Sequence, residues 1–598
     1  MVVLLVALAS VPIVTSALHL APRWVTQGDE ATIALRSDDV LTADTPLLGM
    51  PSSLGESTGE QVHHPGPLEF QAIGVVAALV DEPRVALAVA ACVNVVSIGV
   101  ALVWASRLGG RPMLALATVV AAALTWSLRG AVLSTPFNPY VAVLPLLAFL
   151  ASVAAAWAGR RWAVTSAIVF GSWAAQAHLT ATGPVIAAAA AAAAYGLASV
   201  WRRGGVSWTS ARWRGAAGGA ALLGCWLLPL VDVAANEGGN PWALLTAGGS
   251  SEQRALGFGA ALDVVVNALA LRPCWAQAGA GPFELLAPPS TFDRIVAGAL
   301  LLLVVTLAVR LRRDRPALAG AAIGAGAALA AGGLLTAKIP TAIYNTYALH
   351  NYLWIWPVSA VLWLVAVGGI GHLLASRTRG RRLTPTMVVA AATGVSLLLA
   401  VGSLGAPHRR ADLTSASYVK ALGPRLVGAL DPDGRYLLEL DRELDVFAVQ
   451  TGLLYAMEHA GVDVRVPSRF VAAFGEHRVD DGETRQVLRV QLGRSAPEPP
   501  PRSSVVARYE PAPDLVEDRL RMEAALTEAV RARGGVEILG SPAITPDGAS
   551  DWVESGGLLA ALRFGFLPED LADLPETTAL ADLALEPVLH VAVLLGPR

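Results

Sequence analysis

The chain has 598 residues, of which 54% are hydrophobic and only 15% are charged, and its mean hydropathy is +0.53. A soluble protein carries roughly 25% charged residues, so this composition excludes a chain that is soluble throughout and predicts a membrane protein. The formal net charge of −3 excludes nucleic-acid binding, because no basic surface is available to neutralise phosphates. Of the 47 acidic residues, 30 follow position 405, whereas the long apolar segments all precede it. We therefore expect a membrane region before about residue 405 and a region in water after it.

Eleven segments are apolar and long enough to cross a bilayer, which takes about 20 residues in a helix. They lie near residues 2–19, 84–105, 112–128, 138–157, 162–179, 184–200, 215–233, 294–310, 317–336, 352–373 and 386–404. Every second connection between them is rich in arginine, from Arg107 and Arg111 to Arg377 and Arg382. Cytoplasmic loops concentrate positive charge, so we expect a multi-pass protein of the cytoplasmic (inner) membrane, with its N-terminus inside and its C-terminal region outside.

Two of these spans have a second interpretation. Residues 1–20 lack a basic leader and are compatible with a signal peptide ending near Ser16-Ala17-Leu18, or with a start assigned too far downstream. Gly183-Pro184 marks either an external turn between two spans or a kink in one long helix. The turn fits the alternation of arginine-rich loops and the kink does not, so we predict the turn.

The three cysteines, Cys92, Cys225 and Cys274, form no CxxC motif and no cluster with histidine. They support neither a zinc site nor a disulfide framework, and we interpret them as packing residues.

A polar outer loop, about residues 20–83, separates the first two spans, although insertion needs no loop of that length. Eight acids lie between Asp29 and Glu69. Asp29 follows the first span closely, so it should lie near the outer membrane face, where partial desolvation raises a carboxyl pKa toward that of a general base. Paired acids such as Asp38 and Asp39 can divide the roles of base and of ligand for a divalent cation or a substrate. The same acids are also compatible with a solvated loop.

The motifs of this loop resemble the N-terminal module of the GT-C superfamily of integral-membrane glycosyltransferases. The resemblance rests on Gly28-Asp29-Glu30, Asp39-Val40, Pro46-Leu47-Leu48-Gly49, His64-Pro65-Gly66-Pro67 and the short apolar helix expected over residues 67–79. Acidic pairs of this kind recur in protein O-mannosyltransferases and arabinosyltransferases, and the closer likeness is to a bacterial multispanning group related to them. One departure is the polar stretch after Gly55, where the pattern would have an aromatic residue before His-Pro.

The resemblance implies inverting transfer of a sugar from a polyprenyl-phosphate donor to an acceptor hydroxyl outside the cytoplasmic membrane. Asp29 would be the general base, and Glu30, Asp39 and His64 would position acceptor, phosphate or cation, with Asp38 as a substrate ligand. The cofactor stays open, a divalent cation such as Mg²⁺ or Mn²⁺ being the candidate.

Further candidates for substrate binding lie at the outer ends of other spans: Arg129, Asn138, Gln176, His178, Lys338, His350 and Tyr352. Arg129 either holds a carrier phosphate in its guanidinium fork or anchors a helix at the interface. Gln176 and His178 form a polar pair near the membrane that is unfavourable unless it faces a cavity. Lys338 and His350 either stabilise a phosphate leaving group or belong to an interface belt, and Tyr352 either stacks on a sugar or belongs to the same belt.

After about residue 406 the composition becomes that of a soluble α/β domain. Strands are predicted over 435–440, 462–466 and 487–492, helices over 446–460 and 514–533, and a proline-rich linker over 495–504. This region either binds the acceptor or stabilises the outer face.

We therefore predict an α-helical polytopic membrane protein of GT-C-like fold over residues 1–405, followed by an extracytoplasmic α/β domain over 406–598. The predicted function is transfer of a sugar from a polyprenyl-phosphate donor to a cell-envelope glycan or glycolipid. A transporter or flippase of lipid-linked sugars would need polar groups at mid-membrane on several helices, and the spans contain almost none. A non-enzymatic envelope assembly protein is the third interpretation.

Overall fold

The computed structural model describes residues 1–52, 62–80, 82–202, 208–236, 239–250, 255–279, 281–341, 348–377, 385–404, 413–441, 444–536, 544–554, 571, 574–583 and 586–598. The chain divides into two compact units. Unit 1 comprises Met1–Pro22 and Thr45–His408, and unit 2 comprises Arg23–Asp44 and Arg409–Arg598. Residues 23–44, which lie within the predicted first outer loop, therefore belong to the same unit as the C-terminal domain.

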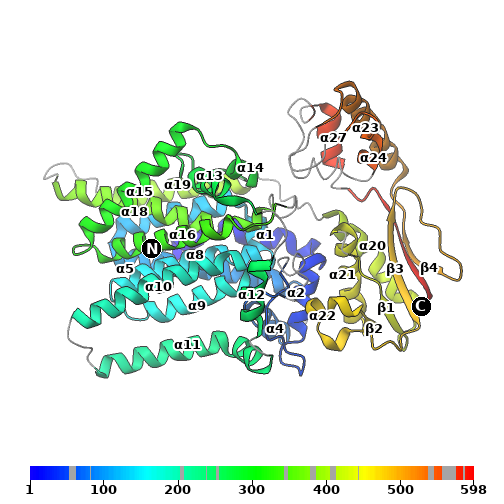
Figure 1. Ribbon diagram of the computed structural model, residues 1–598, viewed down its shortest axis with the longest axis horizontal. Coiled ribbons are helices and arrows are strands. Elements are labelled where there is room, and N and C mark those ends of the chain that lie inside the picture. The colour runs from blue at the N-terminus through cyan, green and yellow to red at the C-terminus, as the bar shows by residue number, and fades with distance from the viewer. Residues whose placement is uncertain are drawn as a thin grey trace. The chain divides into compact units, whose positions relative to one another are not determined.

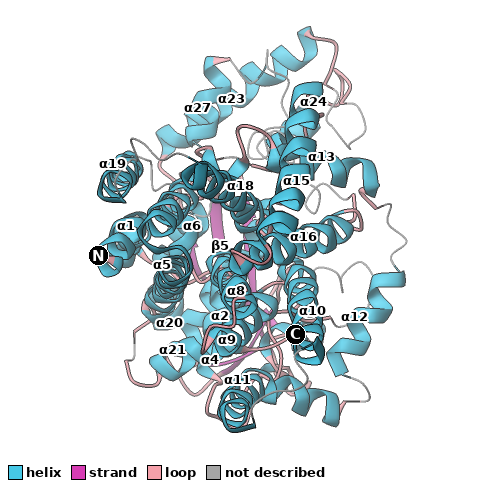
Figure 2. Ribbon diagram, turned by 90° about the vertical axis from the view of Figure 1, so that its left-hand side faces the viewer, coloured by secondary structure: helices cyan, strands magenta, loops and turns pink. Residues whose placement is uncertain are grey.

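Unit 1 is helical, and the described residues contain ten helices that are long and apolar enough to cross a membrane. Its longer elements are α1 (Val2–Leu20), α5 (Val85–Ser127), α8 (Val143–Trp157), α9 (Ala163–Ala177), α10 (Leu179–Arg202), α11 (Trp208–Ala235), α12 (Gly239–Ser250), α13 (Gly257–Leu269), α15 (Thr291–Leu311), α16 (Pro316–Thr336), α18 (Ile355–Arg377) and α19 (Pro385–Leu404). Short elements join them: η1 (Ala21–Arg23), α4 (Leu68–Ala77), α6 (Gly130–Ser134), α7 (Asn138–Val141), η2 (Cys274–Ala276), α14 (Pro282–Leu286) and η3 (Leu349–Asn351). Figure 2 views several of the long helices, among them α1, α5 and α19, nearly end-on.

These helices differ from the predicted spans in two places, at α9 and in a segment predicted to be a loop. The predicted spans 84–105 and 112–128 are both present within α5, as two helices joined by a kink at the non-helical Gly110 (φ +65°), shortly before Pro112. Glycine adopts such a conformation without the steric penalty that a side chain brings. Helix α9 has only 15 residues and is too short to count among the ten. A further candidate, Gly257–Ala276, lies in a segment predicted to be an outer loop.

The predicted break between the fifth and sixth spans is present, but it lies at His178 and not at Gly183-Pro184. His178 is extended (φ −150°, ψ 135°) between α9 and α10, and Pro184 lies inside α10. The hydroxyl of Thr182 donates to the carbonyl oxygen of Ala175 at 2.9 Å, so a side chain of α10 satisfies a carbonyl of the last turn of α9. This break places His178 outside both helices.

Small residues let the helices of unit 1 approach closely. Gly320 and Gly332 of α16 lie against the rings of Trp157 and Trp354, where an added Cβ would come within 2.4 and 2.3 Å of side-chain atoms. Ala188 of α10 and other alanines of α16 are fully buried in the same core. Close approach through glycine and alanine is typical of helix packing in membranes. Of the three cysteines predicted to be packing residues, Cys274 is buried in this core, Cys225 is partly buried and Cys92 is exposed, so the prediction is wrong for Cys92.

Unit 2 is built on a five-stranded sheet of order β2-β1-β3-β5-β4. The strands are β1 (Arg435–Leu438), β2 (Asp463–Arg465), β3 (Gln486–Gly493), β4 (Ser504–Tyr509) and β5 (His590–Pro597). Strand β1 is parallel to β2 and β3, whereas β5 is antiparallel to β3 and β4. Helices α20 (Leu413–Ala429) and α21 (Leu444–His459) lie beside the sheet (Figure 1), and Leu422, Leu453, Leu488 and Val593 share one buried core.

The remaining described elements of unit 2 are η4 (Ser468–Phe470), α22 (Val471–Phe474), η5 (Glu476–Arg478), α23 (Pro513–Ala532), α24 (Ala549–Glu554) and α27 (Pro575–Leu583). The predicted strands over 435–440, 462–466 and 487–492 are present as β1, β2 and β3, and the predicted helices as α21 and α23. Strands β4 and β5 and helix α20 were not predicted.

The N-terminal segment of unit 2 forms α2 (Gly28–Asp38), which packs against α21. Ile33 and Leu35 are buried, and Leu35 joins the core beneath the sheet. The hydroxyl of Thr451 donates to the carbonyl oxygen of Gly28 at 3.3 Å. Gly28 itself has φ +56°, a conformation that favours glycine at the start of this helix. The acids of the first outer loop are thus carried by a helix that is part of an α/β domain.

Candidate functional site

The predicted acids lie at the two ends of α2. Asp29 and Glu30 occupy its first turn, where carboxylates interact favourably with the helix dipole; Asp29 is exposed and Glu30 is buried. Asp38 is the last helical residue and is exposed, whereas Asp39 follows it and is buried. At 1.5 Å per residue the two ends are about 14 Å apart, so the two pairs of acids cannot contact the same atom of a substrate.

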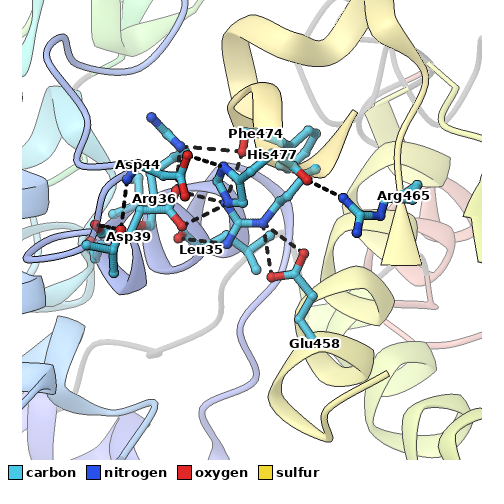
Figure 3. Close-up of polar contacts among 12 residues, drawn as sticks. Leu35, Arg36, Asp39, Asp44, Glu458, Arg465, Phe474 and His477 are labelled. Carbon is cyan, nitrogen blue, oxygen red and sulfur yellow. Dashed lines mark hydrogen bonds and ion pairs between the residues drawn. The ribbon is translucent and has the colours of Figure 1, made fainter. Parts of the chain in front are cut away.

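Asp39 is held by three basic side chains (Figure 3). Its Oδ2 accepts from Nη1 of Arg478 at 2.8 Å and from Nη1 of Arg36, and its Oδ1 lies 3.2 Å from Nε2 of His477. Arg478 also forms an ion pair with Glu458, with Nε and Oε1 2.8 Å apart. We call Arg36, Asp39, Glu458, His477 and Arg478 the α2 clamp.

The α2 clamp also fixes the backbone. Arg478 donates from Nη2 to the carbonyl oxygen of Leu35 at 3.3 Å and from Nη1 to that of Phe474 at 2.9 Å. One buried guanidinium therefore joins the last turn of α2 to the end of α22. Figure 3 shows these groups converging around Asp39 and His477.

Asp38 and Asp39 are adjacent in the chain, but their surroundings shift their pKa values in opposite directions. Burial alone would raise the pKa of Asp39, but hydrogen bonds from His477 and Arg478 outweigh it and hold that pKa below its ordinary value. Asp38 keeps contact with solvent, but the surrounding protein removes part of its hydration and raises its pKa to about 6, because the nearby His459 and Arg478 only partly compensate for this desolvation. Asp39 is thus a fixed anion, while Asp38 can exchange a proton near neutral pH.

In unit 1, three histidines from three separate segments lie together. His64 belongs to the first outer loop, His178 to the break between α9 and α10, and His350 to η3. The ring centroids of His64 and His178 are 5.0 Å apart, and those of His178 and His350 are 5.6 Å apart. Phe137 packs edge-on against His350 at 5.9 Å. We call His64, His178 and His350 the histidine cluster.

The histidines of the cluster are neutral at physiological pH. Burial lowers the pKa of His64 to about 3, that of His350 to about 4 and that of His178 well below its ordinary value. The other imidazoles of the cluster lower the pKa of His64 and His178 further. The Nδ1 atom of His64 accepts a hydrogen bond from the backbone N–H of Leu179 at 3.1 Å, so the ring proton lies on Nε2.

Asn138 and Gln176, predicted to bind substrate, hold the backbone around the histidine cluster. The Asn138 amide donates to the carbonyl oxygen of Ala177 at 3.0 Å. Gln176 accepts from the N–H of Leu68 at 3.3 Å through Oε1 and donates to the carbonyl oxygen of Cys225 at 2.7 Å through Nε2. Both side chains are buried. Their bonds connect α7, α9, α4 and α11, which makes them supports of the cluster.

The other candidates of unit 1 vary in exposure. Arg129 is exposed and has φ +61°, an uncommon conformation for a residue with a side chain, and its guanidinium lies beside Gly279, where an added Cβ would be 2.8 Å from Nη2. Lys338 is exposed just after the end of α16. Tyr352 is fully buried in the core, so its ring packs inside the protein. The polar stretch after Gly55 lies outside the described residues.

Among the described residues, no group of three or more His, Cys, Asp or Glu side chains is arranged to hold a metal ion. The structure brings together His64, His178 and His350 in unit 1, with Asn138 and Gln176 holding the backbone beside them. It separates the predicted acids into two pairs, Asp29 with Glu30 and Asp38 with Asp39, at opposite ends of α2. Glu458, His477 and Arg478 could not be predicted as partners of Asp39, because they lie more than 400 positions from it and form no local motif.

This chain is similar to several solved structures. No family model matches the sequence, and no curated protein matches it either. A crystal structure of ArnT from Cupriavidus metallidurans bound to undecaprenyl phosphate is 15% identical, with a TM-score of 0.45, and the match covers 82% of this chain and 92% of that one. The archaeal oligosaccharyltransferase AglB from Archaeoglobus fulgidus, in complex with an inhibitory peptide and a dolichol-phosphate, is 12% identical, with a TM-score of 0.37, over 82% of this chain and 68% of that one.

Proposed function

We propose that the protein is a membrane glycosyltransferase that moves a sugar from a polyprenyl-phosphate donor to a hydroxyl of a cell-envelope glycan or glycolipid on the outer face of the membrane. The observation that best supports this proposal is that α2 is held in place while Asp29 stays exposed. This helix is fixed by the α2 clamp and by Leu35, yet Asp29 in its first turn is exposed. A general base must be within reach of the acceptor hydroxyl and held by a rigid support, and the position of Asp29 on α2 meets both conditions.

The reaction assigned to this site is a single displacement. Asp29 accepts the proton of the acceptor hydroxyl as its oxygen bonds to the anomeric carbon of the sugar. The bond between that carbon and the phosphate oxygen breaks, and the lipid phosphate leaves with the electron pair, so the configuration is inverted. Asp39 takes no proton because Arg36 and Arg478 hold it as an anion.

The test uses the full-length protein, purified and returned to lipid vesicles, with a panel of undecaprenyl-phosphate sugars and an envelope extract as acceptor. Wild type should release undecaprenyl phosphate and label the acceptor, and Asp29→Asn should lose transfer by about 100-fold to 10,000-fold, the range of general-base catalysis. Asp433→Asn, an exposed acid in a turn of the same unit, is the matched control and should retain activity.

Two results would contradict the proposal. Full activity of Asp29→Asn with an unchanged fold would remove the general base. The failure of wild type to use any donor would favour a transporter of lipid-linked sugars or an envelope assembly protein.

A further inference from the structure

The turn between α8 and α9 is fixed by its own backbone. Gly159 has φ +70°, and the N–H of Arg160 donates back to the carbonyl oxygen of Ala155 at 3.0 Å. A left-handed glycine followed by such a bond is the Schellman motif, which ends many helices. Trp162 also has a left-handed backbone (φ +68°), which is uncommon for a bulky residue, just before α9 begins. Arg160 and Arg161 are therefore carried by a rigid turn.

Arg160 joins this turn to α5. Its Nη2 donates to the carbonyl oxygen of Arg107 at 3.0 Å. Arg107 lies in the last turn of α5 before the kink, where carbonyl groups lack helical partners. The guanidinium of Arg107 lies over the ring of Trp104, 5.5 Å from its centroid, and that of Arg161 lies over the ring of Trp162 at 5.1 Å. We call Arg107, Arg160 and Arg161 the arginine site.

A small core supports the arginine site. Trp104 is buried with Ala155 and Ala163 in a cluster formed by α5, α8 and α9. The indole N–H of Trp104 donates to the hydroxyl of Ser166 at 3.3 Å, and Ser166 shares a hydrogen bond of 2.7 Å with Ser152. The three helices that meet at the arginine site are thus fastened together at this end.

No carboxylate offsets the charge of the arginine site. The sequence has no Asp or Glu between residues 83 and 231, a stretch that includes α5, α8 and α9. In the described part of the chain, neither Asp314, in the loop before the neighbouring α16, nor any other acid pairs with the three guanidinium groups. All three side chains are exposed. Because a guanidinium has five N–H donors, most donors of the site are available to a ligand.

The arginine site and the histidine cluster lie at opposite ends of the membrane helices. Helix α9 begins directly after Trp162 and ends directly before His178, and its 15 residues span about 22 Å. The arginines predict that this end faces the cytoplasm. It therefore lies near the headgroups of the other leaflet. Val164 and Val169 of α9 are exposed and apolar, so an acyl chain can lie along this helix below the site.

An anionic phospholipid is the ligand that suits these groups. A guanidinium fork binds two phosphate oxygens at once, and basic pockets between membrane helices bind lipid headgroups. The ammonium of a zwitterionic headgroup such as phosphatidylethanolamine would need an acid beside it, and the described residues of the site supply none. Phosphatidylglycerol carries a phosphate without an ammonium and has no such need.

We propose that the arginine site binds the phosphate of an anionic phospholipid, whose acyl chain lies along α9. This lipid is neither the donor nor the acceptor of the proposed reaction, and the inference does not depend on sugar transfer. Arg107 belongs to α5, whereas Arg160 and Arg161 belong to the turn between α8 and α9. A phosphate held by all three would add a second link between these elements beside the kink of α5.

The experiment measures lipid binding to the purified full-length protein in detergent by native mass spectrometry. Phosphatidylglycerol should bind at least about tenfold more tightly than phosphatidylethanolamine, and its binding should weaken as the ionic strength rises. Glycerol phosphate, which has a phosphate and no acyl chain, distinguishes a lipid from a free phosphate and should bind far more weakly than phosphatidylglycerol.

Paired variants separate a defined site from a general attraction to basic loops. Arg160→Gln with Arg161→Gln should weaken binding of phosphatidylglycerol about 25-fold, or about fivefold per arginine. Arg312→Gln with Arg313→Gln is the matched control, because it removes two exposed arginines from the loop before α16 and should change the affinity less than about twofold. Replacing Arg160 and Arg161 by lysine keeps the charge and should weaken binding less, since an ammonium lacks the fork.

Photochemical crosslinking locates the lipid on the wild-type protein, so it does not depend on how the variants fold. Phosphatidylglycerol with a diazirine in its acyl chain should label residues 163–169 of α9, and phosphatidylethanolamine with the same chain should label them less.

Three results would overturn the inference. Equal losses in the two glutamine pairs would show a diffuse attraction to basic loops. Equal binding of the two phospholipids, or crosslinks that avoid α9, would remove the anionic lipid from this site. Equal affinity for glycerol phosphate would assign the site to a free phosphate.

Discussion

Asp39 and Arg478 stand 439 positions apart in the chain and form one buried ion pair, with Nη1 and Oδ2 2.8 Å apart. Each side chain is 7% exposed. Because Arg478 also binds Glu458 and two carbonyl oxygens, its removal would break several buried polar contacts at once and leave the Asp39 anion with Arg36 and His477 alone. This pair therefore determines whether α2 stays on the α/β domain.

Replacing Arg478 by methionine should destabilise unit 2. The change leaves Asp39 and Glu458 without their shared cation, and breaking a buried pair in this way costs about 3–5 kcal/mol. Arg435→Met is the matched control, since Arg435 pairs with Asp463 and Asp481 at the surface and should contribute little. Tryptophan fluorescence during denaturant unfolding of the full chain measures the free energy of unfolding of both variants. Equal effects of the two changes would contradict the central role of Arg478.

Asp38 and Asp39 should respond to asparagine in opposite directions. The pKa of Asp38 is about 6 in the fold and lower when unfolded, so its ionisation opposes folding as the pH rises through that range. Asp38→Asn should therefore raise the melting temperature at about pH 7 and leave it unchanged at about pH 4. The pKa of Asp39 is lowered, so its contribution is present above its unfolded pKa and is lost on acidification. Asp39→Asn should lower the melting temperature at about pH 7. Shifts of the same sign at that pH would refute the assignment.

The histidine cluster should make the unliganded protein less stable as the pH falls. Its three imidazoles have lowered pKa values in the fold, so the unfolded chain binds protons first as the pH falls below about 6.5. Melting temperatures followed from about pH 7 to about pH 4.5 should fall, and His178→Gln should make the fall less steep. A slope that is the same in this variant would show that His178 does not titrate on unfolding.

Gly130→Ala tests the packing of α6 against α1. An added Cβ at Gly130 would lie 1.8 Å from the carbonyl oxygen of Pro12 in α1, and backbone cannot move aside easily. We expect the free energy of unfolding to fall by about 1–3 kcal/mol or more, as is typical of overpacking. Gly326→Ala in α16, where an added Cβ meets nothing within 4 Å, should be neutral or slightly stabilising. A melting temperature of Gly130→Ala equal to that of wild type would mean that α1 does not pack in this way.

The membrane helices could be predicted from the sequence because a single apolar run specifies each of them. The predictions failed where a run is short or interrupted. Gly257–Ala276 contains Asp263 and Asn267, so its apolar character is diluted, and it was taken for part of a loop. Strand β5 was missed for a different reason. It lies between β3 and β4 and is buried on both faces, so its residues do not alternate as those of a half-buried strand do.

The candidate site was predictable only in part. The acids of α2 were found because they cluster in the chain, and His64 because it lies in a local motif. The α2 clamp was not found, since it depends on pairing between residues 36–39 and 458–478. Asn138 and Gln176 were recognised as polar residues near the membrane, but only the structure shows that each bonds to a backbone group.

The division of unit 2 between two distant stretches of chain has a consequence for biogenesis. Residues 23–44 leave the ribosome before nearly all of the membrane helices, whereas Arg478 follows Asp39 by 439 positions. At typical elongation rates that interval is on the order of a minute. During it the apolar side chains of α2, Ile33 and Leu35, lack the core that buries them in the finished protein. Helix α2 can thus be buried only after the C-terminal part of unit 2 has been made, and a chain that terminates before it would carry the acids of α2 on a segment without its core.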